Sequence, residues 1–215
     1  PSASPGATAP SSSTANIIIH KSGLEAEQGF VEPTPKPRAV LRIFGDGKRY
    51  RYLSVGLRAE IDRPKILRNR WKYIIVHNSG TRQGNARSYE YYHRNVRKMQ
   101  NGLAYHFVIG NGNGAGDGAI EIGNRWRRQI NGGHVASDYL NNIAIGICLT
   151  GDFNRDAVTP AQREALTELI EYLRNRVGRI QGKRSIVKAH KEINPRPTDC
   201  PGDRFPYLWF HKTFD

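Results

Sequence analysis

Two histidines and a cysteine occupy positions from which they could hold a metal ion. His77 follows the apolar run Tyr73–Val76, and His190 follows the apolar segment 185–189. Cys200 lies ten residues after His190, in a proline-rich loop. Zinc binds His nitrogen and Cys sulfur, and a catalytic zinc site uses three protein ligands and leaves a fourth position for water. The spacing is compatible with a His₂Cys site, but an isolated buried cysteine and strand-end histidines with structural roles fit it as well.

These side chains can meet only if strands bring them to one edge of a sheet. Apolar, β-branched runs predict four strands, at residues 73–76, 103–109, 142–149 and 185–189. Helical patterns separate the strands. Because strands alternate with helices, the sequence predicts an α/β fold, a single domain with a central mixed β-sheet flanked by helices.

The clearest helix signal begins at Thr159. Pro160 takes the first helical position, and Gln162 completes a Thr-x-x-Gln capping box. Apolar residues then recur at helical spacing until Gly178, at Leu166, Leu169, Ile170, Leu173 and Val177. A second helix is predicted over residues 88–99, with Tyr92, Val96 and Met99 on one face.

Other polar or glycine-rich positions in this region have structural interpretations. The run Gly110–Gly114 lacks the Gly-Lys-Ser/Thr ending of a phosphate-binding loop, so a hairpin loop is expected there. Cys148 stands in an apolar strand and is interpreted as an inert buried thiol. His106 is interpreted as a histidine of the core or of the layer behind the metal ligands.

Positive charge is concentrated ahead of these elements. The 215 residues include 33 Lys and Arg against 19 Asp and Glu, a formal net charge of +14. Residues 36–72 hold twelve Lys and Arg against three Asp and Glu, which is +9 of that total. This charge indicates a polyanionic partner, such as nucleic acid, an acidic wall polymer or an anionic membrane surface. A solvated basic face is the alternative.

Composition divides the chain into three parts. Residues 1–35 are rich in Pro, Ser and Ala and are expected to be a disordered tail or linker. Residues 36–70 form a basic N-terminal extension, in which the alternating segment 39–57 around Gly45-Asp46-Gly47 predicts a small hairpin. Residues 71–215 form the main domain. We expect no signal peptide and no integral membrane segment in this chain, and its two cysteines allow at most one disulfide.

Five local sequences follow one another along the main domain: Tyr-Ile-Ile-Val-His-Asn-Ser-Gly-Thr at 73–81, Ala-Tyr-His-Phe-Val-Ile at 104–109, Asn-Ile-Ala-Ile-Gly-Ile-Cys-Leu-Thr-Gly at 142–151, Thr-Pro-Ala-Gln at 159–162, and Lys-Ala-His-Lys-Glu through Thr-Asp-Cys-Pro-Gly at 188–202. Together they resemble the zinc-dependent N-acetylmuramoyl-L-alanine amidases, which share a fold with phage amidase-lysozymes and peptidoglycan recognition proteins. The resemblance covers roughly residues 71–210 and none of the preceding part. Five motifs in order are far more specific than any one of them.

The resemblance implies a role for each matching residue. His77, His190 and Cys200 match the three zinc ligands. Tyr105 matches the catalytic tyrosine of the family, although an amphipathic strand residue would also fit its position. Thr198 falls where some members carry Lys and others Thr, and it would add a hydrogen bond near the reacting carbonyl.

Three further positions carry information from the same resemblance. His134 matches a histidine that lines the substrate groove, although a loop residue without that role is an equal alternative. Asn78 replaces a second His that many members have after the first ligand. Some cell-wall-recycling members place a catalytic Glu where Cys148 stands, so its absence here favours the tyrosine-dependent branch.

The implied activity is zinc-dependent cleavage of the amide between N-acetylmuramic acid and the L-alanine of the stem peptide, with peptidoglycan as the substrate. Retention of Cys200 favours this enzyme over a non-catalytic peptidoglycan-binding protein of the same fold. A nucleic-acid-binding protein is the weakest alternative, because Phe44, Tyr50 and Tyr52 give only a faint pattern of aromatics among basic residues. We expect an extracellular, periplasmic or wall-associated protein, or a phage endolysin, that residues 36–72 attach to an anionic wall polymer or lipid surface.

Overall fold

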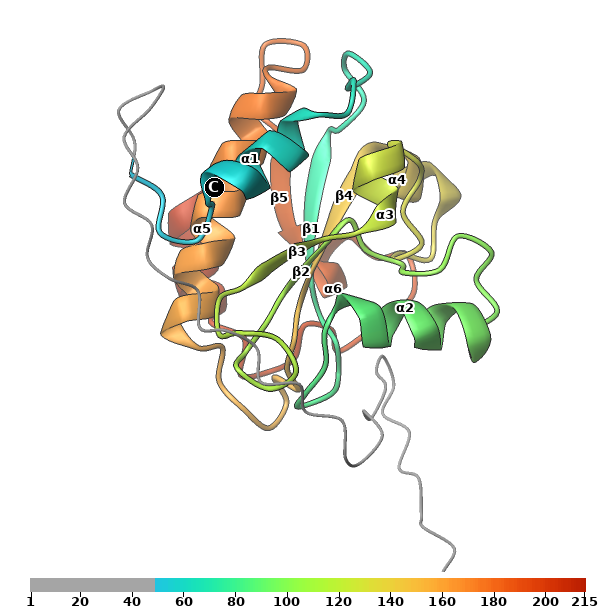
Figure 1. The fold of residues 1–215 in the computed structure, drawn as a ribbon, viewed down its shortest axis with the longest axis vertical. Helices are drawn as coiled ribbons and strands as arrows, with labels where there is room; N and C mark the ends of the chain where they lie inside the picture. The colour runs from blue at the N-terminus through green and yellow to red at the C-terminus, as the bar shows by residue number, and fades with distance from the viewer. Residues whose placement is uncertain (1–48) are drawn as a thin grey trace, which may run out of the picture.

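A mixed β-sheet forms the centre of the protein. The computed structural model describes residues 49–215, and Figure 1 shows the sheet between helices on both sides. The strand order is β3-β2-β4-β1-β5. β1 pairs in parallel with β4 and β5, β2 pairs in parallel with β4, and β3 runs antiparallel to β2. The strands are β1 (Tyr73–Asn78), β2 (Phe107–Ile109), β3 (Ile120–Ile122), β4 (Ala144–Leu149) and β5 (Ile186–Ala189). The predicted α/β fold with a mixed sheet is confirmed.

Helices cover both faces of this sheet, and α5 and α2 lie on opposite sides of it in Figure 1. The helices are α1 (Val55–Asp62), α2 (Ala86–Asn95), α3 (Asn124–Arg128), α4 (Asp138–Ile143), α5 (Pro160–Val177), α6 (His190–Ile193) and α7 (Tyr207–Phe214). α5 begins and ends as its sequence predicts. Thr159 and Gln162 form a capping box around Pro160, and Gly178 caps the C-terminus in the left-handed region, at φ 73°.

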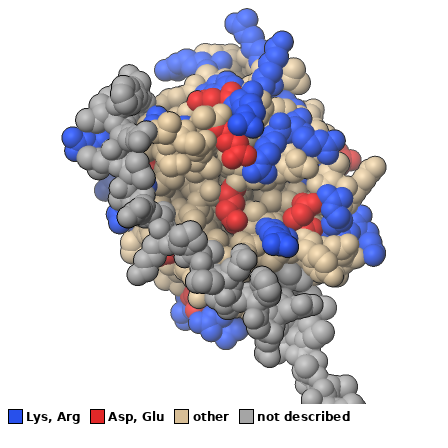
Figure 2. Space-filling model, in the orientation of Figure 1, with Lys and Arg blue, Asp and Glu red and all other residues tan. Residues whose placement is uncertain are grey.

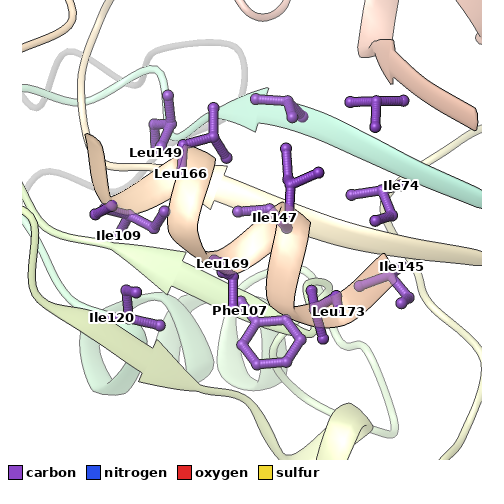
Figure 3. Packing of buried hydrophobic residues seen from close by; sticks show 14 of the residues in the cluster. Ile74, Phe107, Ile109, Ile120, Ile145, Ile147, Leu149, Leu166, Leu169 and Leu173 are labelled. Carbon is purple, nitrogen blue, oxygen red and sulfur yellow. The ribbon is translucent and has the colours of Figure 1, made fainter. Parts of the chain in front are cut away.

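The main hydrophobic core lies between the sheet and α5. Every second strand residue points to this side, so that large apolar side chains from β1, β2 and β4 pack against Leu166, Leu169 and Leu173 of α5 (Figure 3). The sheet contributes Ile74, Val76, Phe107, Ile109, Ile145, Ile147 and Leu149 to this core. Because the core occupies one face completely, the alternate residues of the same strands are left to build the opposite face.

The opposite face carries small and polar residues of the strands together with the apolar Ile75 and Val108. Cys148 lies beside His77 and Val108 in the register of β4 with its two neighbours. Gly146 stands two residues before Cys148 and therefore lies on the same face. The alternation of the buried strands thus places His77 on the side of the sheet away from α5.

Some predicted element boundaries differ from the structure. α2 starts at Ala86, because the Asn85 side chain accepts from the Ser88 backbone and Ser88 bonds back to Asn85. The helix ends before Val96, whose side chain is 53% exposed, so the prediction for Val96 is wrong. Met99 lies beyond the helix but still packs, partly buried, against the cluster that contains Tyr89. The strand predicted over 103–109 is regular only at 107–109, and residues 142–143 belong to α4.

The hairpin predicted over residues 39–57 lies only partly within the described residues. Its turn and first arm lie outside the described residues. Its second arm contains no strand, because α1 starts at Val55 with Ser54 as its N-cap. A serine followed by a helical pattern is the signal that the alternating interpretation missed.

α1 packs into the same core as the main domain, although the sequence assigned it to the extension. Leu53 and Ile61 are 1% and 0% exposed. The indole nitrogen of Trp126 donates to the Ile61 carbonyl oxygen at 3.1 Å. Backbone amides of residues 51–53 bond the carboxylate of Glu168 on α5. The predicted boundary at residue 70, between the basic extension and the main domain, therefore stays a prediction. A stability measurement can test whether α1 unfolds together with the main domain.

We predict that Ile61→Ala lowers the free energy of unfolding of the whole domain by about 2–5 kcal/mol, because it leaves a cavity in a filled core. Val55→Ala in the same helix is the matched control, since Val55 is 45% exposed and should change stability by less than about 0.5 kcal/mol. Urea unfolding of both variants gives the comparison. Equal, small effects would show that α1 unfolds independently of the sheet.

Candidate metal centre and active site

The pairing of β1 with β5 brings His77 and His190 together. Val76 and Ala189 are partners in the register of these parallel strands, and each is followed by one of the histidines. The two imidazole rings have centroids 4.3 Å apart. His190 is the first residue of α6, so its side chain leaves the sheet at the carboxyl edge, where His77 also lies.

Cys200 reaches the same place from the loop after α6. The Lys191 backbone N–H donates to the Cys200 carbonyl oxygen at 2.9 Å, which folds the loop back onto α6. The Asn78 backbone N–H donates to Cys200 Sγ at 3.3 Å, which brings the sulfur to the end of β1. The side chain of Thr198 supports this turn, since its hydroxyl accepts from the Cys200 backbone N–H at 3.2 Å.

The three side chains fit a zinc ion. One ligand atom from each of His77, His190 and Cys200 lies within 4.8 Å of the others, and Cys200 Sγ is 3.8 Å from His77 Nδ1. Ligands at Zn–N and Zn–S bond lengths in a tetrahedron lie roughly 3.5 Å apart. Both ring nitrogens of His190 are buried without a hydrogen bond of good geometry within residues 49–215, although the Asn194 side chain lies near enough to interact. Buried polar atoms are rarely left so, and a metal ligand is the chemistry that this residue offers.

Burial sets the protonation of the three side chains. It lowers the pKa of His77 well below its ordinary value, helped by the neighbouring His190 and His134. Burial also lowers the pKa of His190 to about 4 and raises the pKa of the Cys200 thiol to about 12. Both imidazoles are therefore neutral and ready to bind a metal at neutral pH, whereas the thiol has to release a proton when a metal binds.

Tyr105 lies against the metal-ligand group. It precedes β2, is 7% exposed, and its ring centroid is 5.2 Å from that of His77. Burial raises the pKa of its phenol well above the ordinary value, and Cys148 adds to the effect. The phenol therefore keeps its proton at neutral pH and can act as a hydrogen-bond donor.

His134 and His106 lie behind His77. His134 is 6% exposed, and its Nδ1 lies 3.0 Å from Nε2 of His77. His106 is fully buried and accepts from the Gly146 backbone N–H at Nδ1, while Nε2 faces the Ile130 carbonyl oxygen. The interpretation of His106 as a histidine of the core agrees with these contacts. The predicted substrate contact of His134 stays a prediction.

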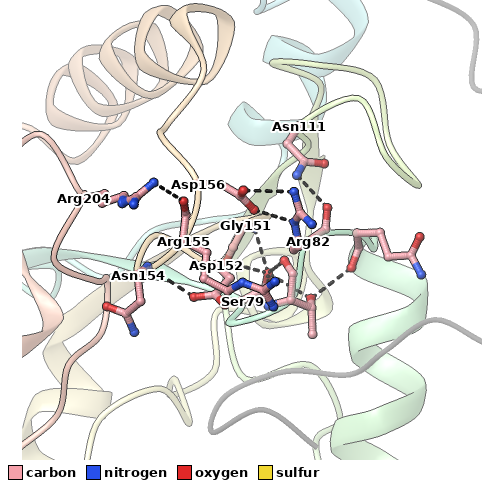
Figure 4. A network of polar contacts seen from close by, with 11 residues as sticks. Ser79, Arg82, Asn111, Gly151, Asp152, Asn154, Arg155, Asp156 and Arg204 are labelled. Carbon is pink, nitrogen blue, oxygen red and sulfur yellow. Dashed lines mark hydrogen bonds and ion pairs between the residues drawn. The ribbon is translucent and has the colours of Figure 1, made fainter. Parts of the chain in front are cut away.

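A polar network holds the loops that follow β1 and β4 (Figure 4). Arg82 makes two hydrogen bonds to the carboxylate of Asp156, at 2.7 and 3.1 Å. The Ser79 hydroxyl accepts from the Gly151 backbone N–H at 2.9 Å. Since Ser79 comes two residues after His77, these contacts hold the segment that follows His77 in place.

The sequence interpretation did not include His93, which is part of the wall around Tyr105. Its ring centroid is 5.7 Å from that of Tyr105, and its Nδ1 accepts from the Ala104 backbone N–H. The Asn85-x-x-Ser88 capping signal could have revealed it, since the correct start of α2 places Tyr89, Tyr92 and His93 on the buried side. The two cysteines, for which one disulfide was allowed, are both free.

A mixed sheet with a buried His₂Cys group at the carboxyl edge of its parallel strands defines an α/β domain that could hold a metal ion beside a tyrosine. Comparison with known families makes this class specific. The family of N-acetylmuramoyl-L-alanine amidases (Amidase_2) matches residues 67–203, which is more than half of the chain. The protein belongs to this family.

Solved structures agree with this assignment. The endolysin N-acetylmuramoyl-L-alanine amidase LysCS from Clostridium intestinale URNW is 28% identical, with a TM-score of 0.54 over 69% of this chain and 87% of that chain. Human PGRP-IBETAC, in complex with glycosamyl muramyl pentapeptide, is 22% identical, with a TM-score of 0.53 over 65% of this chain and 81% of that chain. Bumblebee PGRP-SA is 21% identical, with a TM-score of 0.52 over 65% of this chain and 80% of that chain. The two PGRP structures show the shared fold alone. No curated protein sequence matches the chain.

We predict that His93 makes the protein less stable as the pH falls. Burial lowers the pKa of His93 to about 4, from an ordinary value of 6.5, so only the unfolded chain takes up its proton between these values. The free energy of unfolding therefore decreases as the pH is lowered from about 6.5 to about 4. In metal-free protein, urea unfolding between pH 7 and pH 5 should show a shallower pH dependence for His93→Gln than for wild type. Parallel curves would contradict the buried, neutral state of His93.

Proposed function

We propose that the protein is a peptidoglycan hydrolase that cleaves the amide bond between N-acetylmuramic acid and the L-alanine of the stem peptide. The observation that carries this proposal is the buried group of His77, His190 and Cys200 in a chain of the amidase family. The similar solved structure of an endolysin amidase supports the same substrate class.

The chemistry of the site suits this bond. An amide is a weak electrophile with a poor leaving group. A zinc ion held by His77, His190 and Cys200 would polarise the carbonyl and supply a nucleophilic water near neutral pH. The protonated phenol of Tyr105 would donate a hydrogen bond to the oxyanion that develops on the carbonyl oxygen. The Thr198 hydroxyl, which accepts from the Cys200 backbone, keeps its own proton free to donate nearby.

A non-catalytic peptidoglycan-binding protein is the second candidate. The observation that favours it is the likeness of the fold to PGRP structures, one of which holds a muramyl pentapeptide. The complete ligand set and the adjacent tyrosine favour the enzyme. Incubation with purified peptidoglycan separates the two, because only the enzyme releases free stem peptides.

The proposed substrate places the protein where peptidoglycan is exposed. We infer an extracellular, periplasmic or wall-associated protein, and a phage endolysin is the alternative. The similar endolysin structure supports the second of these. None of the described helices has the length and hydropathy to cross a membrane.

The basic residues ahead of β1 support attachment to a polyanion of the cell envelope. Arg63, Lys65 and Arg68 are exposed and form no ion pair with the described residues. Lys and Arg side chains gather along the upper edge of the face shown in Figure 2. We infer that residues 36–72 hold the protein near an anionic wall polymer or lipid surface.

We predict that Cys200→Ser abolishes both zinc retention and stem-peptide release, because a serine hydroxyl is a poor ligand for zinc. Zinc content is measured by elemental analysis, and released peptides are measured by mass spectrometry on the same sample. Treatment of wild type with a chelator should have the same effect, and added zinc should reverse it. Cys148→Ser is the matched control and should retain zinc. A Cys200→Ser variant with normal zinc content and turnover would refute the ligand assignment.

For Tyr105→Phe we predict a loss of turnover of roughly 10²–10³-fold with zinc content unchanged, because one donor to the oxyanion is removed while the ring stays in place. The rate constant kcat on a soluble muropeptide gives the measurement. A rate within twofold of wild type would remove Tyr105 from the catalytic machinery.

We predict that the triple variant Arg63→Gln, Lys65→Gln and Arg68→Gln binds isolated cell walls several-fold more weakly than wild type at low salt. The difference should disappear near 1 M salt, where charge interactions are screened within about 3 Å. Co-sedimentation with walls at both salt concentrations gives the measurement.

The matched control removes the same charge from another exposed region, at Arg87, Arg97 and Lys98. An equal loss of wall binding in both triple variants would show that net charge alone matters. Unchanged binding in the first variant would leave Arg63, Lys65 and Arg68 as part of a solvated face.

A further inference from the structure

A chain of hydrogen bonds runs from the sheet backbone to the metal-ligand group through His134. Its Nε2 faces the Ala144 carbonyl oxygen at 3.4 Å, and its Nδ1 faces His77 Nε2 at 3.0 Å. A carbonyl oxygen can only accept, so the proton of His134 lies on Nε2. Nδ1 of His134 is then an acceptor, and His77 has to donate from Nε2.

This chain decides which nitrogen of His77 is available to a metal. With its proton on Nε2, neutral His77 carries a bare lone pair on Nδ1. Nδ1 is the nitrogen that lies 3.8 Å from Cys200 Sγ. The carbonyl of Ala144 thus sets the tautomer of a side chain in another strand, with the His134 ring as the link.

The surroundings of His134 are shaped to hold its ring in this orientation. A Cβ atom on Gly132 or on Gly146 would come within 2.4 Å of His134 Cδ2, so only glycine leaves room for the imidazole at either position. The Asn141 side chain fixes the loop, because its oxygen accepts from the backbone N–H groups of His134 and Val135. The slot between Gly132 and Gly146 is therefore filled by the imidazole ring of His134.

We propose that His134 is a positioning residue that fixes the tautomer and the orientation of the metal ligand His77. The proposal rests on the zinc-binding part of the proposed function. Loss of the partner that orients a metal-binding histidine typically lowers metal affinity 10- to 100-fold. The same loss should leave the Michaelis constant for the substrate unchanged at saturating zinc, whereas loss of a groove contact would raise it.

Two variants of His134 with similar shape test this assignment. His134→Asn keeps an acceptor, because its Oδ1 can occupy the place of Nδ1, while His134→Leu fills the slot without one. We expect zinc to bind 10- to 100-fold more weakly to His134→Leu and within about threefold of wild type to His134→Asn. Competition with a zinc-binding dye on the full chain gives the dissociation constants. His93→Gln removes a buried histidine from the same layer and should bind zinc as wild type does.

A spectroscopic measurement on zinc-free wild type tests the proposal without any variant. Long-range ¹H–¹⁵N correlation spectra of the imidazoles should show the proton of His77 on Nε2 and that of His134 on Nε2. A proton on His77 Nδ1 would overturn the proposal, as would wild-type zinc affinity in His134→Leu or an equal loss in the Leu and Asn variants. Failure of wild type to bind zinc would overturn the proposed function instead, and the spectrum would still decide the role of His134.

Discussion

The register of β1 between β4 and β5 is the constraint on which the site depends. In register, Val76 lies opposite Ala189, and His77 lies opposite Cys148. A shift of one residue would turn His77 toward α5 and replace it with Val76 or Asn78. The buried apolar residues of β1 prevent this shift, because Ile74 and Val76 fill the core beneath α5. Burial of the strand therefore fixes the position of His77.

The two faces of the sheet have different roles: one forms the hydrophobic core and the other carries the candidate site. The α5 face is filled by large apolar side chains, and its buried polar groups, such as the Gln162 amide, bond backbone carbonyl oxygens. The opposite face holds a layer of histidines, in which His77, His106 and His134 bond backbone groups or one another. Such a layer is costly unless its members are paired. The Ala144 carbonyl oxygen and the Gly146 N–H of β4 supply part of this pairing, to His134 and His106 respectively, so the same strand supports the core and the site.

The sequence predicted the parts of this structure that local patterns determine. The buried strands, the capped α5 and the end positions of His77 and His190 follow from periodicity and turn chemistry, and the ordered motifs indicated the family. The link between His77 and His134 could not be predicted, because it joins β1 to a loop through side chains 57 residues apart. The start of α1 was missed because residues 49–57 alternate in polarity, whereas the structure has Ser54 as the N-cap of a helix. The contacts of this segment with Glu168 and Trp126 are long-range and could not be read from the local pattern.

The three ligand-type residues come from distant parts of the chain. His77 and Cys200 are 123 residues apart, and their proximity depends on the pairing of β5 with β1 and on the backbone hydrogen bond that ties the following loop to α6. In a zinc finger the metal gathers neighbouring ligands and drives folding. Here the pairing of β5 with β1 and the contact of the loop with α6 bring the three side chains together, so the position of the group depends on the long-range connections of the sheet and not on a local sequence motif.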